Sequence, residues 1–200
     1  VKAADGLPDE VLAALSRAAT PTVRARLLRV LGRIGGPAAF PPLAAACVAA
    51  EPEIRDAAVR SVADWPDAQA ADLLLNLAKT AEQPAHRALA LRGYLRLLEQ
   101  ATPEQRAATA AKCSGALAAA GTSDLRKAVL GTLSHLTHPA ALDLAVSVLD
   151  DPETRAEAGL AVVTLARALL TTDRDAVRKA MQEAITSPDP ATATAVRGIL

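Results

Sequence analysis

Two histidines three residues apart, His135 and His138 in SHLTHP, have a spacing that suits metal binding. Such a pair can hold a transition metal when a third histidine or an acidic side chain completes the site. His86 is remote in the sequence, and the chain contains no HExxH motif. A glycine-rich phosphate loop after a strand and a recognisable Ser, His, Asp order are also missing. The sequence therefore predicts no metal site, no cofactor and no catalytic residue.

The two cysteines, Cys47 and Cys113, are a second possible source of chemistry. They lie far apart in the chain and fit neither a CxxC motif nor the spacing of metal ligands. Isolated cysteines of this kind are usually small apolar side chains of a core. We therefore expect both to be buried free thiols.

Arginine is the third possibility, because its planar guanidinium pairs with carboxylates and phosphates. Two pairs stand four residues apart, Arg29 with Arg33 and Arg92 with Arg96. On a helix such like-charged neighbours cost roughly 0.2–0.5 kcal/mol. They indicate either a surface for an anionic partner or merely solvated helix faces. Both interpretations stay open at this stage.

The composition predicts the elements that position these residues. Of the 200 residues 51% are hydrophobic, but only 2% are aromatic, and most of the apolar residues are Ala and Leu. An all-α fold follows. The longest apolar run, residues 38–50, contains two prolines and is too short to span a membrane. Lys plus Arg and Asp plus Glu both number 22, so no net charge attracts nucleic acid, which we regard as an unlikely partner.

A repeat organises these helices. One arginine opens every second predicted helix, with separations of 31, 32, 39 and 29 residues between successive copies. The five arginines are Arg24, Arg55, Arg87, Arg126 and Arg155. Four, seven and ten positions after them stand mostly apolar residues, which share one face of a helix. Proline and glycine separate the helices, as in Gly35-Gly36-Pro37.

Six helix pairs result. Their predicted ranges are 8–35, 37–65, 67–99, 103–137, 139–170 and 173–200. Neighbouring pairs in such an array bury their apolar stripes against one another. We expect a single repeat domain over residues 1–200, and we expect it to be a segment of a longer protein.

The alternating helices, the joining sequence GRIGGPAAFPPL and the repeated arginine resemble the HEAT-repeat family, most closely the bacterial HEAT-like repeats of phycobilin lyases. The resemblance implies a right-handed α–α superhelix of the armadillo-like class. Residues 86–100, HRALALRGYLRLLEQ, are also similar to segments in helical-repeat regions of large, often exported bacterial proteins. That second resemblance implies an exported or periplasmic location, with the cytoplasm as the alternative.

The apolar stripe leaves offsets 5 and 9 on the opposite face of the second helices, which lines the concave side in HEAT-like stacks. Five arginines lie there: Arg29, Arg33, Arg60, Arg92 and Arg96. They are our candidate partner-binding residues. The five repeated arginines lie instead at the edge of the stripe, near acidic residues such as Glu53 and Asp124. We expect them to be structural anchors that bond to neighbouring pairs.

Trp65 and Tyr94 occupy stripe positions and are therefore expected in the core. This placement argues against HEAT-like DNA glycosylases, which use exposed aromatic residues, and the histidine pattern argues against metal-dependent hydroxylases built from HEAT-like pairs. The sequence favours a noncatalytic scaffold that contacts a protein partner, or another domain of its own chain, through the concave face. The alternative is an accessory or lyase-like domain that binds a small anionic ligand in the same groove.

Overall fold

The computed structural model describes residues 7–199 and contains only helices and turns in that range. The predicted limits of the domain, residues 1–6 and Leu200, lie outside the described residues. The α-helices are α1 Leu7–Arg17, α2 Pro21–Ile34, α3 Phe40–Ala46, α4 Pro52–Ala63, α5 Ala71–Thr80, α6 Pro84–Leu98, α7 Arg106–Ala119, α8 Ser123–Ser134, α9 Pro139–Ser147, α10 Arg155–Leu169, α11 Arg174–Ala184 and α12 Pro190–Arg197. Short 3-10 turns, Ala68–Ala70 and Pro103–Gln105, precede α5 and α7. The all-α prediction and the six helix pairs are confirmed for this part of the chain.

Local sequence signals set the ends of the helices. Thr20 caps α2 by accepting a hydrogen bond from the Val23 N–H at 3.3 Å, and Pro21 takes the first helical position, where no N–H is needed. Gly35 and Gly36 end the same helix with φ of 72° and 90°, a region that residues with a side chain rarely adopt. The Gly-Gly-Pro sequence therefore forms a turn after α2, as predicted.

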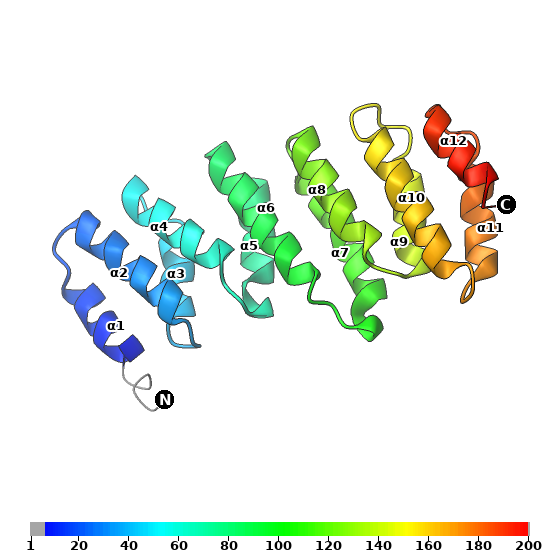
Figure 1. Ribbon diagram of the computed structural model, residues 1–200. Coiled ribbons are helices and arrows are strands. Elements are labelled where there is room, and N and C mark those ends of the chain that lie inside the picture. Colours follow the sequence, from blue (N-terminus) through cyan, green and yellow to red (C-terminus); the bar gives the residue numbers. More distant parts are fainter. Residues whose placement is uncertain (1–6, 200) are drawn as a thin grey trace. The chain divides into compact units, whose positions relative to one another are not determined.

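The chain divides into two compact units, residues 1–97 (unit 1) and residues 98–200 (unit 2). In unit 1 the second helices α2, α4 and α6 stand side by side, and α1, α3 and α5 form the other layer (Figure 1). In unit 2 the second helices α8, α10 and α12 form one layer, and the first helices α7, α9 and α11 form the other. Each unit is a stack of three helix pairs. The single domain over residues 1–200 and its superhelical hand stay predictions.

The predicted apolar stripe forms the core of both units. Stripe positions at offsets 4, 7 and 10 are buried in every repeat, with the single exception of the half-buried Ile34. Trp65 is fully buried and Tyr94 is 3% exposed, which confirms that both aromatic residues are core residues. A buried leucine or valine stabilises the fold by about 1.5–3 kcal/mol relative to an exposed one. The repeated stripe is thus the main source of stability within each unit.

Glycines bring neighbouring second helices unusually close. A Cβ atom on Gly32 of α2 would lie 2.5 Å from the Ser61 Cβ of α4. One on Gly93 of α6 would lie 2.5 Å from the Ala63 carbonyl oxygen of α4. Gly159, which stands at a core position of α10, leaves room for the side chain of Thr192 on α12. A leucine is therefore excluded at Gly159 because another helix fills its space.

Over the described residues, the structure has no helix that is both long enough and apolar enough to span a membrane.

Candidate anion-binding face

Four exposed arginines line one face of the second helices in unit 1. They are Arg29 and Arg33 on α2, Arg60 on α4 and Arg92 on α6, and we call them the arginine face. The side chains of Arg29 and Arg60 are 51% and 55% exposed. All five residues at offset 5, which include Gly131 and Leu160 in unit 2, are exposed, as the helical periodicity predicts. Within unit 2 the same offset carries no arginine.

A shallow depression of about 180 Å³ lies on the arginine face between α2 and α4. Gly32 and Ser61, the residues at the close approach of the two helices, form part of its lining. Arg29, Arg33, Arg60 and Asp64 form the rest. The depression therefore presents three guanidinium groups and one carboxylate to solvent.

Asp56 of α4 organises the positive charges around it. Its two carboxylate oxygens accept hydrogen bonds from Arg60 Nε, both at 3.0 Å, and Arg29 Nη2 lies 4.0 Å from Oδ2. The Nε2 atom of His86 lies 3.2 Å from Oδ1. The hydrogen bond from Arg60 is the largest cause of the lowered pKa of Asp56, and that of His86 adds to it against the opposing effect of burial. Asp56 thus joins α2, α4 and α6.

The sequence reasoning missed the roles of Asp56 and His86. Asp56 and Arg60 are spaced i,i+4, which is a readable signal for an ion pair on one helix. His86 is 2% exposed, and its contact with Asp56 bridges 30 residues of sequence. No local pattern indicates that contact.

Arg96 bonds to the end of the neighbouring helix α4, and its partner-binding role stays a prediction. Its Nη2 atom donates to the carbonyl oxygens of Ala63 at 3.1 Å and Trp65 at 2.6 Å, which end helix α4. These carbonyls have no partner within their own helix, and a cation stabilises a helix C-terminus. Arg96 is also only partly exposed. We therefore leave it out of the arginine face.

Three of the five repeated arginines bond as structural anchors would. Arg55 Nη1 donates to the carbonyl oxygen of Ala49 at 2.8 Å, and Arg155 Nε donates to that of Leu149 at 3.2 Å. In both cases the acceptor lies six residues earlier, in the loop between the two helices of a pair. These arginines therefore tie the second helix to its own entering loop.

The anchors also reach the next repeat. Arg126 donates to the Asp151 carboxylate at 3.0 Å, and Arg55 lies 3.9 Å from the carboxylate of Glu82. Each of these acids precedes the second helix of the following pair. Arg24 and Arg87 are exposed and form no side-chain hydrogen bond or ion pair within residues 7–199, so their anchoring role stays a prediction.

The two histidines between α8 and α9 have different surroundings. His138 caps α9, because its Nδ1 atom accepts a hydrogen bond from the Ala140 N–H at 3.1 Å. His135 is exposed and lines a cavity of about 340 Å³ with Arg106 and Glu99. Among the described residues, no group of three or more His, Cys, Asp or Glu side chains is placed to hold a metal ion.

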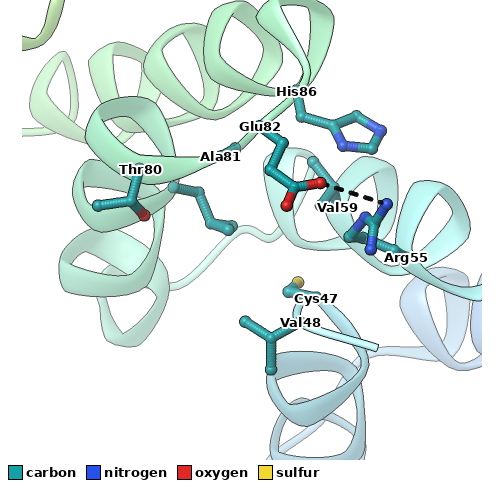
Figure 2. A pocket seen from close by; sticks show the side chains of 9 residues that line it. Cys47, Val48, Arg55, Val59, Thr80, Ala81, Glu82 and His86 are labelled. Atoms are coloured by element: carbon teal, nitrogen blue, oxygen red, sulfur yellow. Dashed lines mark ion pairs between the residues drawn. The ribbon is translucent and has the colours of Figure 1, made fainter. Parts of the chain in front are cut away.

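A second cavity in unit 1, about 190 Å³, lies beside Cys47 (Figure 2). Arg55 and Glu82 face each other across it, and His86 and Val59 also contribute to its lining. The Arg55 guanidinium is already held by Ala49 and Glu82, and His86 is directed to Asp56. The polar groups around this cavity therefore hold the helices together.

Both cysteines are buried free thiols, as predicted, and burial raises the pKa of each to about 12. At pH 8 only about one thiol in ten thousand is then the reactive thiolate. We expect a thiol reagent to label neither Cys47 nor Cys113 in the folded protein and to label both in denaturant. Absorbance of the released chromophore measures this labelling. Fast labelling of the folded chain at either position would show that its burial is wrong.

Residues 8–94 match the family model of HEAT repeats, which confirms the predicted family over that range. No curated protein matches the chain. Among solved structures, human deoxyhypusine hydroxylase in complex with glycerol is similar, with 16% identity over 96% of this chain and 95% of that chain and a TM-score of 0.38. A similarity at that level supports no argument about activity. The more specific resemblance to the repeats of phycobilin lyases stays a prediction.

Proposed function

We propose that this chain, with HEAT repeats over residues 8–94, is a noncatalytic binding domain that holds an acidic protein segment on the arginine face. The segment belongs either to a separate protein or to another domain of the same polypeptide. HEAT repeats commonly act as scaffolds for protein interactions. The assignment of this contact to the arginine face rests on the charge and exposure of its four side chains.

The observation that supports the proposal is that the arginine face carries more positive than negative side chains. Arg33 and Arg92 are exposed and have no hydrogen-bond or ion-pair partner among residues 7–199. Asp56 engages Arg60 and lies near Arg29, and Asp64 is the other acid beside them. Four arginines thus face two aspartates. Because like charges repel in the free protein, a carboxylate-rich partner gains from each guanidinium that it approaches.

The size of the depression favours a protein segment over a small ligand. Sites for small molecules usually enclose about 300–1,000 Å³, whereas the depression on the arginine face has about 180 Å³. The arginines are also spread over three helices. A chain that crosses the helices can reach all of them, but a compact anion cannot.

Charge reversal at the two free arginines tests the proposal. We expect R33E/R92E to lower the affinity for fluorescently labelled poly-L-glutamate by tenfold or more, on the order expected for two lost cation contacts. The expected attraction also weakens as salt rises, because both partners are solvent-exposed. Fluorescence anisotropy at two salt concentrations measures both effects.

A matched control changes the same net charge elsewhere in unit 1. Arg17 on α1 and Lys79 on α5 are exposed cations in the last turns of first-layer helices. The R17E/K79E variant should bind poly-L-glutamate as the parent does, apart from a small long-range effect. Equal losses in both variants would mean that only overall charge matters. Tight binding of inorganic phosphate, abolished by R33E/R92E, would favour the small-ligand alternative instead.

A further inference from the structure

Three arginines of the face occupy the same position in three consecutive repeats. Arg29, Arg60 and Arg92 each lie five residues after the repeated arginine of their helix, and all three are exposed. We call them the rungs. Arg33 lies one turn further along α2 and is not a rung.

Close packing sets the distance between rungs. Gly32 lets α2 and α4 approach, and Gly93 does the same for α6 and α4. Ser61 Oγ of α4 donates to the Leu28 carbonyl oxygen of α2 at 3.5 Å. On the other side of α4, Arg96 of α6 donates to the Ala63 carbonyl oxygen of α4. A side chain thus contacts the backbone of the adjacent helix at both interfaces. Packed helices lie about 8–10 Å apart. Equivalent positions on α2, α4 and α6 therefore repeat at about that interval.

Of the regular backbone conformations, polyproline II matches this interval best. It has three residues per turn and a rise of 3.1 Å, so every third side chain points the same way after about 9 Å. In a β-strand the side chains of one face repeat after about 6.6 Å, which is too short. In an α-helix, residues seven positions apart lie on the same face but about 10.5 Å apart, which is longer than the interval between the rungs. An α-helix is also about 10–12 Å in diameter, so it would contact only the most exposed side chains of α2, α4 and α6.

We infer that the partner is an acidic segment in the polyproline II conformation, with a carboxylate at every third residue, which crosses α2, α4 and α6 so that each carboxylate meets one rung. This inference rests on the proposed function and specifies its ligand. The rungs retain donors for it, because Asp56 uses only the Nε of Arg60 among the five N–H donors of that side chain. Asp56 also orients Arg60 before a ligand arrives, which reduces the entropy lost on binding.

Three synthetic peptides with blocked ends test the spacing. The first is (Glu-Pro-Pro)₃, the second is its isomer with three consecutive glutamates followed by six prolines, and the third is (Glu-Pro-Pro)₂. Blocked ends remove the terminal charges, so the first two peptides differ only in the position of the carboxylates. We expect (Glu-Pro-Pro)₃ to bind about tenfold more tightly than its isomer, measured by fluorescence anisotropy at low salt.

Loss of one rung should depend on peptide length. R92A should weaken (Glu-Pro-Pro)₃ about tenfold, but (Glu-Pro-Pro)₂ only about twofold, because the shorter peptide can still use the rungs of α2 and α4. R33A serves as the comparison on the same face and should affect (Glu-Pro-Pro)₃ less than R92A does. Circular dichroism of each variant checks that the helices remain folded.

The outcomes separate the two proposals. If both isomers bind equally well and R33E/R92E abolishes both, the acidic partner stands and the polyproline II spacing is wrong. If no acidic peptide and no poly-L-glutamate binds at about 1 mM, both proposals are wrong. If single-stranded oligothymidylate of similar charge binds more tightly than (Glu-Pro-Pro)₃, the partner is a nucleic acid and the inference is overturned.

Discussion

Replacing Gly93 by alanine is expected to destabilise unit 1 by about 1–3 kcal/mol, the usual cost of overpacking a well-packed contact. The new Cβ would lie 2.5 Å from the carbonyl oxygen of Ala63 and 2.9 Å from its Cα. Both atoms belong to the backbone of α4, so no side chain can rotate away. Alanine raises helix propensity by up to about 1 kcal/mol relative to glycine, which offsets only part of the clash.

The same residue change at Gly131 should have the opposite sign. Gly131 lies inside α8, and a Cβ there meets no atom within 4 Å. G131A should therefore stabilise the protein by about 0.5–1 kcal/mol through helix propensity alone. Urea unfolding followed by circular dichroism measures both variants. A neutral or stabilising G93A would show that α4 and α6 are further apart than described, and the spacing of the rungs would lose its support.

Helical periodicity predicted which side of each second helix is buried. Leu28 and Leu31 in α2 and their counterparts in the other repeats are core residues, and the positions at offset 5 are all exposed. This succeeds because one helix has a fixed angle of 100° per residue, so that a few apolar residues orient the whole element. The repeat then applies the same orientation to each copy, which made the fold and the exposed face readable from sequence.

Helical periodicity did not predict the hydrogen-bond partners of individual polar side chains. Arg96 lies at the predicted exposed offset, yet it reaches carbonyl groups 31 and 33 residues earlier in the chain. The contact depends on where α4 ends relative to α6, and small changes in packing angle decide it. Periodicity gives the direction of a side chain but not its distance from the neighbouring helix.

Gly159 shows the converse limitation. A glycine at a core offset indicates that something else fills the space, but the sequence does not say what. In the structure the side chain of Thr192 on α12 occupies it, 33 residues later. The spacing of equivalent residues is again close to one repeat. Such pairs become predictable only after the relative position of two helices is known.

Asp56→Asn is expected to destabilise unit 1 by about 1–2 kcal/mol at neutral pH. The change keeps the size of the side chain but removes the charge that Arg29, Arg60 and His86 approach. Hydrogen bonds to charged groups contribute about 1.5–3 kcal/mol, and the smaller value applies because the Asp56 side chain is 32% exposed and partly screened by solvent. The strongest interaction that is lost is the charge-assisted hydrogen bond from Arg60. Urea unfolding of parent and variant gives the difference.

The loss of stability caused by D56N should be largest at neutral pH and should decrease in acid, because the pKa of Asp56 is lowered in the folded protein. The folded-state pKa of Asp56 lies below its ordinary value of 3.8, chiefly because of the hydrogen bond from Arg60. The ionised carboxylate therefore contributes its full stability above that ordinary value, and the contribution is lost as pH falls through the folded-state pKa. Other carboxylates titrate in both proteins alike, so the difference between parent and variant isolates Asp56 and should shrink below about pH 4.

Asp64→Asn provides the matched control on the same helix. Asp64 is exposed at the end of α4 and forms no ion pair within residues 7–199. Its replacement should change stability by less than about 0.5 kcal/mol, or raise it slightly, because a negative charge is unfavourable at a helix C-terminus. If D56N were as stable as D64N at pH 7, Asp56 would not hold the three helices together. The oriented Arg60 rung would then lose its basis, because nothing else among the described residues bonds to its guanidinium.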